Sequence, residues 1–224
     1  MLMSIYDRHG GLPAETFGPL DWYGVPAEWQ DADVMGMPRG AHIAPPRAAW
    51  TRGDYISTYT GRFWPMSPRA SEIDIKDIAH SLAMQCRYAG HVKRFLSVAE
   101  HSVHIARWLL ENAPHAALHG LLHDAPEALS GFGDVARPVK PARVREIEDR
   151  VWQAVAAAFG LSPVMPDEVH EADNRIIADE MRQNMHECDP KYDDPLGVEL
   201  EYWDPVRGER EFLELYRMLT GGRS

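Results

Sequence analysis

Apolar residues at helical spacing dominate the chain from Asp74 onward and constrain its fold more than any other feature. The pattern predicts helices over residues 74–88, 97–111, 114–125, 143–159, 167–185 and 205–219. Several boundaries carry their own signals, with Ser97 and Glu100 as a capping box and Gly90 and Gly160 as stops. We therefore expect an all-α domain of about six helices.

The segments before Asp74 lack this helical period. Residues 55–65, YISTYTGRFWP, carry β-branched and aromatic side chains around Thr60-Gly61 and predict a small β-hairpin. Residues 1–54 are rich in Pro, Gly and Trp without any sustained period, so we expect an irregular N-terminal arm ahead of a domain over residues 55–220. The aromatic residues of this arm indicate packing on its own domain or on a neighbouring subunit.

Composition and charge narrow the range of partners. With 224 residues, 45% of them hydrophobic, the chain can bury a full core. Its net charge of −11 disfavours a nucleic acid polymer or an anionic membrane surface as the main partner. Cys86 and Cys188 lack metal-type spacing, the N-terminus lacks a signal-peptide pattern, and no apolar run is long enough to span a membrane. We expect a cytoplasmic protein with reduced thiols and no membrane contact.

Four polar side chains occupy positions that favour a metal site. His101 and Asp173 each lie on the apolar face of a predicted helix; a single histidine there is more often a core residue, but a buried carboxylate needs a compensating cation or several donors. His123 and Asp124 would diverge by about 100° on an intact helix, yet Pro126 loosens the last turn and lets them converge. Two imidazoles and two carboxylates suit a divalent metal ion such as Mn, Co, Fe, Ni or Zn. Small residues at Ala116 and Gly120 would let the helix that carries a second histidine approach closely.

The order of the motifs resembles a known family. They are SVAEHS at 97–102, LLHDAPEAL at 121–129, GDVARPVK at 133–140 and the later Ala172-Asp173. In this order they are similar to the HD superfamily of metal-dependent phosphohydrolases, whose fold is an HD-domain helical bundle. The motif sequences resemble the branch that contains bacterial deoxyribonucleoside 5′-nucleotidases and phage deoxynucleoside triphosphohydrolases. The resemblance covers about residues 57–185 and implies that the metal ligands are His101, His123, Asp124 and Asp173.

The resemblance also implies roles for the neighbouring residues. Glu127, one helical turn after His123, would protonate the leaving group or orient the attacking water, and Asp134 would assist the water or the substrate. Arg87 would contact phosphate and Tyr88 the sugar or the base. Since an aromatic ring beside the sugar can exclude a 2′-hydroxyl, a deoxyribonucleotide is the expected substrate. Family members commonly form oligomers, so we expect a homo-oligomer.

Basic residues near the motifs are the candidate phosphate ligands. His91 and Lys93 follow Arg87 in the segment CRYAGHVKRF, and Lys140 follows the GD motif. Lys93 and Arg94 fit equally well as basic residues that complement a helix dipole.

These residues are compatible with either of two hydrolytic reactions, or with nucleotide binding without catalysis. Water would attack either the phosphorus of a nucleoside monophosphate, releasing orthophosphate, or the α-phosphorus of a triphosphate, releasing tripolyphosphate. The segments YTGRFWP and CRYAGH resemble phage and bacterial HD proteins that include dATP-directed triphosphohydrolases, and this resemblance slightly favours the triphosphate. The alternative is a non-catalytic regulatory HD module that binds a nucleotide in the same pocket. Glu127 beside the metal ligands favours the hydrolase, because a pure binding site needs no acid there.

Overall fold

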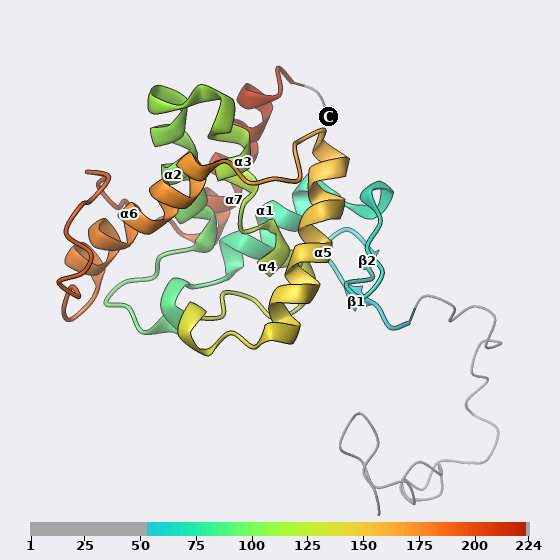
Figure 1. Ribbon diagram of the computed structural model, residues 1–224, viewed down its shortest axis with the longest axis horizontal. Coiled ribbons are helices and arrows are strands. Elements are labelled where there is room, and N and C mark those ends of the chain that lie inside the picture. Colours follow the sequence, from blue (N-terminus) through green and yellow to red (C-terminus); the bar gives the residue numbers. More distant parts are fainter. Residues whose placement is uncertain (1–52, 223–224) are drawn as a thin grey trace, which may run out of the picture. The chain divides into compact units, whose positions relative to one another are not determined.

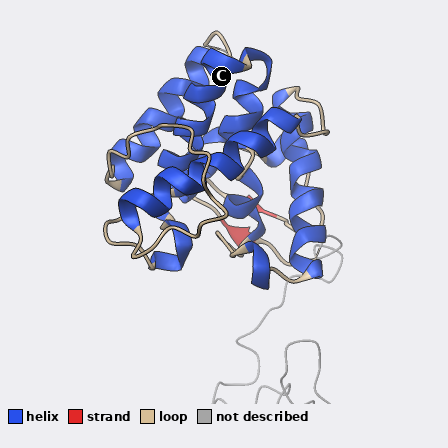
Figure 2. Cartoon of the chain, turned by 60° about the vertical axis from the view of Figure 1, so that its left-hand side comes forward, coloured by secondary structure: helices blue, strands red, loops and turns tan. Residues whose placement is uncertain are grey.

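The computed structural model describes residues 53–222, and helices make up most of them (Figures 1 and 2). The helices are α1 (Ile75–Met84), α2 (Val98–Asn112), α3 (Ala117–Leu122), α4 (Ala125–Ser130), α5 (Ala142–Phe159), α6 (Asp167–Asn184) and α7 (Pro205–Leu219). Short 3-10 turns are η6 (Ala70–Glu72), η7 (Arg87–Gly90), η8 (Pro114–Ala116) and η9 (Arg137–Val139). The strands β1 (Ile56–Ser57) and β2 (Arg62–Phe63) pair antiparallel. An all-α fold with a small β-hairpin is thus confirmed.

The expected N-terminal arm over residues 1–54 lies outside the described residues except for Gly53 and Asp54. The tryptophans that suggested its packing, Trp22, Trp29 and Trp50, lie there too.

Most helix boundaries follow the sequence signals. The Asp74 side chain accepts a hydrogen bond from the Lys76 amide at the start of α1, and Gly160 ends α5 in the left-handed conformation with φ 67°. Only one of the two hydrogen bonds of the expected capping box forms. The Ser97 hydroxyl accepts from the Glu100 amide, but the Glu100 carboxylate turns to the distant loop before α7. A long-range contact has therefore replaced the local one.

The first helix is shorter than predicted, which is a correction to the sequence analysis. α1 ends at Met84, and Gln85 is already extended. The reason is tertiary: the Arg87 amide donates to the Leu96 carbonyl, and the Val98 amide donates to the Gln85 carbonyl. This short antiparallel pairing pulls residues 85–88 out of the helix. Gly90 consequently ends η7 and does not cap α1.

The core is built around α2, which packs against α1, α3, α6 and α7, while α4 packs against α5. α2 and α3 approach very closely at Gly120. A Cβ atom at this position would lie 2.4 Å from Leu109 Cδ1 and 3.1 Å from Ile105 Cγ2. The small residue expected at this position therefore allows the two helices, and the histidines that they carry, to lie side by side without displacing the Leu109 side chain.

Two expectations from composition concern the membrane and the cysteines. Between residues 53 and 222, no helix combines the length and the apolar character that crossing a membrane requires. Cys86 and Cys188 are both free thiols.

Candidate metal centre

The chain breaks its helix at the His123-Asp124 pair. α3 ends at Leu122, α4 begins at Ala125, and Asp124 has φ −91° and ψ 5° between them. Pro126 lies in the first turn of α4, where its missing amide hydrogen costs nothing, so it begins a new helix after the break. The break brings Asp124 Oδ1 to 3.2 Å from His123 Nε2. The adjacent side chains thus converge as predicted, although the short helix after Pro126 was not anticipated.

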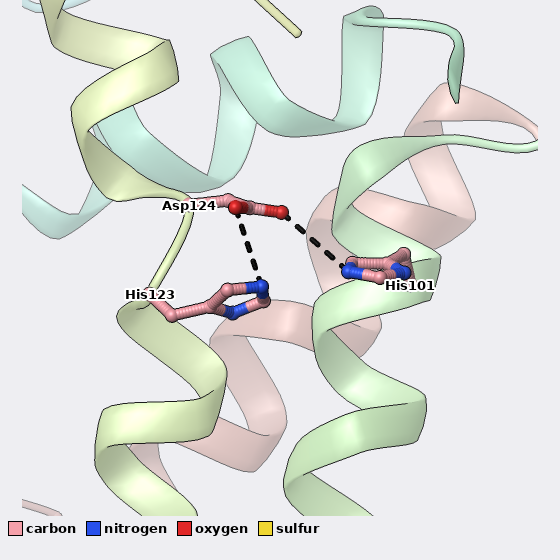
Figure 3. Close-up of side chains that lie close together, drawn as sticks. All are labelled: His101, His123 and Asp124. Atoms are coloured by element: carbon pink, nitrogen blue, oxygen red, sulfur yellow. Dashed lines mark ion pairs between the residues drawn. The ribbon is translucent and has the colours of Figure 1, made fainter. Parts of the chain in front are cut away.

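Side chains from three regions meet at this break. His101 on α2 places its Nε2 3.6 Å from Asp124 Oδ2, and Figure 3 shows both imidazoles turned toward the Asp124 carboxylate. Asp173 on α6 places its Oδ1 3.3 Å from His101 Nε2 and 3.7 Å from His123 Nε2. The structure therefore brings together all four of the predicted metal ligands.

The atoms that face one another in this cluster are buried and lack hydrogen-bond partners among residues 53–222. They are His101 Nε2, His123 Nε2 and Asp124 Oδ2. The opposite nitrogens are occupied: His101 Nδ1 donates to Glu180 Oε1 at 2.7 Å, and His123 Nδ1 donates to the Gly120 carbonyl at 2.8 Å. Because Nδ1 donates in both rings, Nε2 is the nitrogen that faces the cluster. His101, His123 and Asp124 could hold a metal ion, and loss of any proton from Nε2 leaves the tautomer that a metal ligand needs.

The electrostatics of the cluster favour a cation. Burial lowers the pKa of His123, but the carboxylates of Asp124 and Asp173 outweigh burial and raise it to about 9. Burial raises the pKa of Asp173, but its close contacts with the His101 and His123 imidazoles outweigh burial and hold it well below its usual value. The carboxylates thus create a strongly negative potential at the imidazole nitrogens. A divalent ion would take the place of protons there.

Arg87 and Tyr88, the predicted substrate contacts, lie beside the cluster in η7. Arg87 Nη1 is 3.4 Å from Asp134 Oδ2, and its Nη2 donates to Glu180 Oε2 at 3.2 Å. The Tyr88 hydroxyl donates to the same Glu180 oxygen at 2.6 Å. Burial lowers the pKa of the Arg87 guanidinium, but Glu180 and Asp134 outweigh burial and hold it well above its usual value, so Arg87 stays charged. Arg87 Nε has no hydrogen-bond partner in the described part of the chain.

Glu127 lies in a second group of charges, with Lys140 and Glu148. Lys140 Nζ donates to Glu127 Oε1 at 3.2 Å and to Glu148 Oε2 at 3.0 Å. Burial, followed by the negative charges of Asp124 and Asp134, raises the pKa of Glu127 to about 9. This raised pKa favours the protonated form of Glu127 and makes it a candidate proton donor.

These residues line one cavity of about 830 Å³. His123, Asp124, Glu127, Asp134, Asp173, Arg87, Tyr88 and Lys140 all contribute to its wall. Of the predicted phosphate ligands, His91 and Lys93 are exposed and are absent from this wall. Arg87, Tyr88 and Ala89 of η7 line the cavity, whereas His91 and Lys93 beyond this turn do not.

One wall of the cavity follows α6. Val169, Asp173, Ile177 and Met181 line it at intervals of four residues, and therefore lie on one face of the helix. At 1.5 Å per residue, this stripe is roughly 18 Å long, with Asp173 about one third of the way along. The cavity therefore extends to both sides of the metal cluster.

Several residues of the site were not assigned roles from the sequence. Arg137, within the GDVARPVK motif, pairs with Asp173 Oδ2, and Glu180, two turns after Asp173, shares the face of α6 that points to the cluster. Both positions carried a signal, namely a cation inside a motif and a carboxylate on an apolar face. Lys191 and Tyr192 also line the cavity, but they lie in the loop after α6 and have no local pattern that indicates it.

Comparison with known proteins identifies relatives of this chain. No family model matches it. An uncharacterized protein of Escherichia coli (strain K12), YfdR, is 34% identical over 131 residues, which cover 57% of this chain and 71% of YfdR. The chain belongs to the YfdR family. Another relative of this YfdR-like chain, the uncharacterized protein RCAP_rcc00048 of Rhodobacter capsulatus, is 37% identical over 116 residues, or 48% of this chain and 58% of that protein.

Proposed function

We propose that this member of the YfdR family is an HD-type, metal-dependent phosphohydrolase that cleaves the sugar-proximal phosphate of a deoxyribonucleotide. The convergence of His101, His123, Asp124 and Asp173 carries the proposal, because unpartnered buried atoms of the first three face one another beside a large cavity, with Asp173 Oδ1 3.3 Å from His101 Nε2. The donor set suits Mn, Co, Fe, Ni or Zn. When bound, such an ion would lower the pKa of a water molecule and polarise a phosphoryl oxygen. The proposed substrate class implies a cytoplasmic location.

The remaining residues fit the other requirements of phosphoryl transfer. Arg87 stays charged and has an unpartnered Nε, so it can bind a non-bridging phosphate oxygen. The raised pKa of Glu127 suits it to give a proton to the leaving 5′ oxygen, while Lys140 orients its carboxyl group. Asp134 accepts from both the Arg87 guanidinium and the Tyr88 amide. We therefore assign Asp134 to holding these two residues in place.

The extent of the cavity along α6 favours the triphosphate over the monophosphate. Because the cavity continues on both sides of Asp173, a substrate with groups on both sides of the reacting phosphorus fills it better. In that reaction the water oxygen bonds to the α-phosphorus and the bond to the 5′ oxygen breaks. The nucleoside leaves with a proton from Glu127, tripolyphosphate is released with the water oxygen on its former α-phosphorus, and the proton that the attacking water loses restores the acid form of Glu127. A nucleoside monophosphate would occupy one side of the cavity only.

The proposal is tested with full-length protein that has been stripped of metal by a chelator and reloaded with Mn²⁺, Co²⁺, Ni²⁺ or Zn²⁺, or with Fe²⁺ without oxygen. Each form is incubated with ribo- and deoxynucleoside mono- and triphosphates, and products are resolved by chromatography. Tripolyphosphate with a deoxynucleoside would support the triphosphate reaction, and orthophosphate would support the nucleotidase. Nucleotide binding without any product would overturn the enzyme in favour of the regulatory module. The same protein with Glu127→Ala is the control for a contaminating phosphatase.

A further inference from the structure

Glu180 is a fully buried carboxylate that contacts both halves of the site. It lies on α6, two helical turns after Asp173, and its side chain is 0% exposed. Its Oε1 accepts from His101 Nδ1 at 2.7 Å, and its Oε2 accepts from the Tyr88 hydroxyl at 2.6 Å and from Arg87 Nη2 at 3.2 Å. One carboxylate thus joins a candidate metal ligand to the two candidate nucleotide contacts.

The two oxygens act on different parts of the site. An ionised carboxylate only accepts hydrogen bonds, so Oε1 keeps the proton on His101 Nδ1 and leaves Nε2 free to bind a metal ion. Oε2 holds the end of the Tyr88 side chain and one nitrogen of Arg87 against the cavity wall. Any shift of the Glu180 carboxylate would therefore move the candidate metal ligand His101 as well as the candidate nucleotide contacts Tyr88 and Arg87.

The backbone at Tyr88 needs such support. Tyr88 has φ 56° and ψ 33°, and Ala89 has φ 51° and ψ 30°, so two consecutive non-glycine residues adopt the left-handed conformation. The Tyr88 amide donates to Asp134, and its hydroxyl donates to Glu180, so contacts at both ends of the residue hold it in this conformation. Glu180 thereby helps to set the direction in which Tyr88 and Arg87 enter the cavity.

We propose that Glu180 is a positioning residue that couples metal binding at His101 to nucleotide binding at Arg87 and Tyr88. The inference rests on the proposed function, because it takes the ligands of the two sites from it. A metal ion that fixes the His101 ring also fixes the Glu180 carboxylate, and with it the two nucleotide contacts. By thermodynamic linkage, a bound nucleotide strengthens metal binding by the same factor as the metal strengthens nucleotide binding.

The test measures this factor by calorimetry. Full-length protein carries Glu127→Ala so that nucleotides are not consumed, and it is stripped of metal before use. Mn²⁺ affinity is measured with and without each of dATP, dGTP, dCTP and dTTP, and each nucleotide is titrated with and without Mn²⁺. Glu180→Gln, which keeps the size of the side chain but removes its charge, should lower Mn²⁺ affinity by about 10–100-fold. It should also bring the coupling factor close to one.

Asp179 offers a matched control on the neighbouring position of α6. It is also a buried carboxylate, but it accepts from the Leu196 and Gly197 amides, away from the metal cluster. Asp179→Asn should leave both Mn²⁺ affinity and the coupling factor within about twofold, a change of less than about 0.5 kcal/mol. Equal losses in the Asp179 and Glu180 variants would overturn the inference, because general damage to α6 would then explain both.

A second variant keeps the test decisive if Glu180→Gln fails to fold. Tyr88→Phe retains the ring and removes only the hydroxyl that Glu180 accepts from. It should reduce the coupling factor while Mn²⁺ affinity without nucleotide stays within about threefold, a split that a purely structural role would not produce. An unchanged coupling factor in the variants overturns the role of Glu180 alone. A parent protein that binds neither Mn²⁺ nor any of the four nucleotides overturns the proposed function as well.

Discussion

Asp173→Asn is the sharpest test of the metal centre. Asp173 contributes one oxygen near both imidazole nitrogens and pairs through the other with Arg137. Asparagine has nearly the same shape, so packing on α6 should be preserved while the negative charge is lost. Changes to groups that merely support metal ligands commonly cost 10–100-fold in metal affinity, so loss of this charged candidate ligand should cost about 100-fold or more.

The size of the effect follows from linkage. At a free Mn²⁺ concentration about 100 times the dissociation constant, the unaltered protein gains about 2.7 kcal/mol in its free energy of unfolding. A 100-fold weaker site gains only about 0.4 kcal/mol at the same concentration. For a domain of this size, 1 kcal/mol changes the melting temperature by about 2–4 °C. Mn²⁺ should therefore raise the melting temperature by about 5–11 °C in the unaltered protein and by about 1–2 °C in the variant.

The assay is thermal unfolding of chelator-stripped protein, followed by circular dichroism with and without Mn²⁺. Asp179→Asn, on the same helix, should keep the full rise because its carboxylate accepts from the Leu196 and Gly197 amides and not from the candidate metal ligands. If Asp173→Asn keeps the full rise too, Asp173 is not a metal ligand, and the four-residue site is wrong.

Three further predictions concern catalysis and packing. Glu127→Ala should reduce turnover by about 100-fold or more and change nucleotide affinity by only a few fold, because it removes the proton donor; equal turnover would remove the assignment. Gly120→Ala should lower the free energy of unfolding by about 1 kcal/mol in urea titrations, since crowding against Leu109 Cδ1 outweighs the better helix propensity. A more stable variant would contradict the close approach of α2 and α3. Glu100→Ala should cost about 3 kcal/mol in the same titration, because its carboxylate accepts from three backbone amides at 2.8, 2.8 and 2.6 Å. A loss below about 1 kcal/mol would show that these hydrogen bonds contribute little.

Local signals were sufficient for most of the fold. The amphipathic period, the Ser97 and Asp74 caps and the Gly160 stop act within one or two turns, and they predicted the helices to within a few residues. Pro126 was equally informative, because proline has no amide hydrogen and cannot continue a preceding helix without disrupting it, whatever the tertiary structure. The boundary at Met84 could not be predicted, since it depends on pairing with residues about ten positions later.

The candidate site divides in the same way. Its four metal-type side chains were predicted from the order of their motifs, together with the cost of burying a carboxylate on an apolar face without a partner. Their geometry was not predictable from local signals, because it depends on how closely α2, α3 and α6 approach, and Gly120 controls part of that approach. Neither His91 nor Lys93 could be excluded from the cavity before the left-handed turn at Tyr88 was known.

Local sequence thus dictates which residue types are buried, where helices begin and where the helix before Pro126 breaks. Long-range packing dictates which buried polar atoms face one another, and it recruits Glu180 and Arg137 to the cluster. The physical reason lies in the range of the forces. Backbone hydrogen bonding and capping act over a few residues, whereas a buried charge is stabilised by whichever opposite charge or donor the tertiary structure brings within about 3–4 Å.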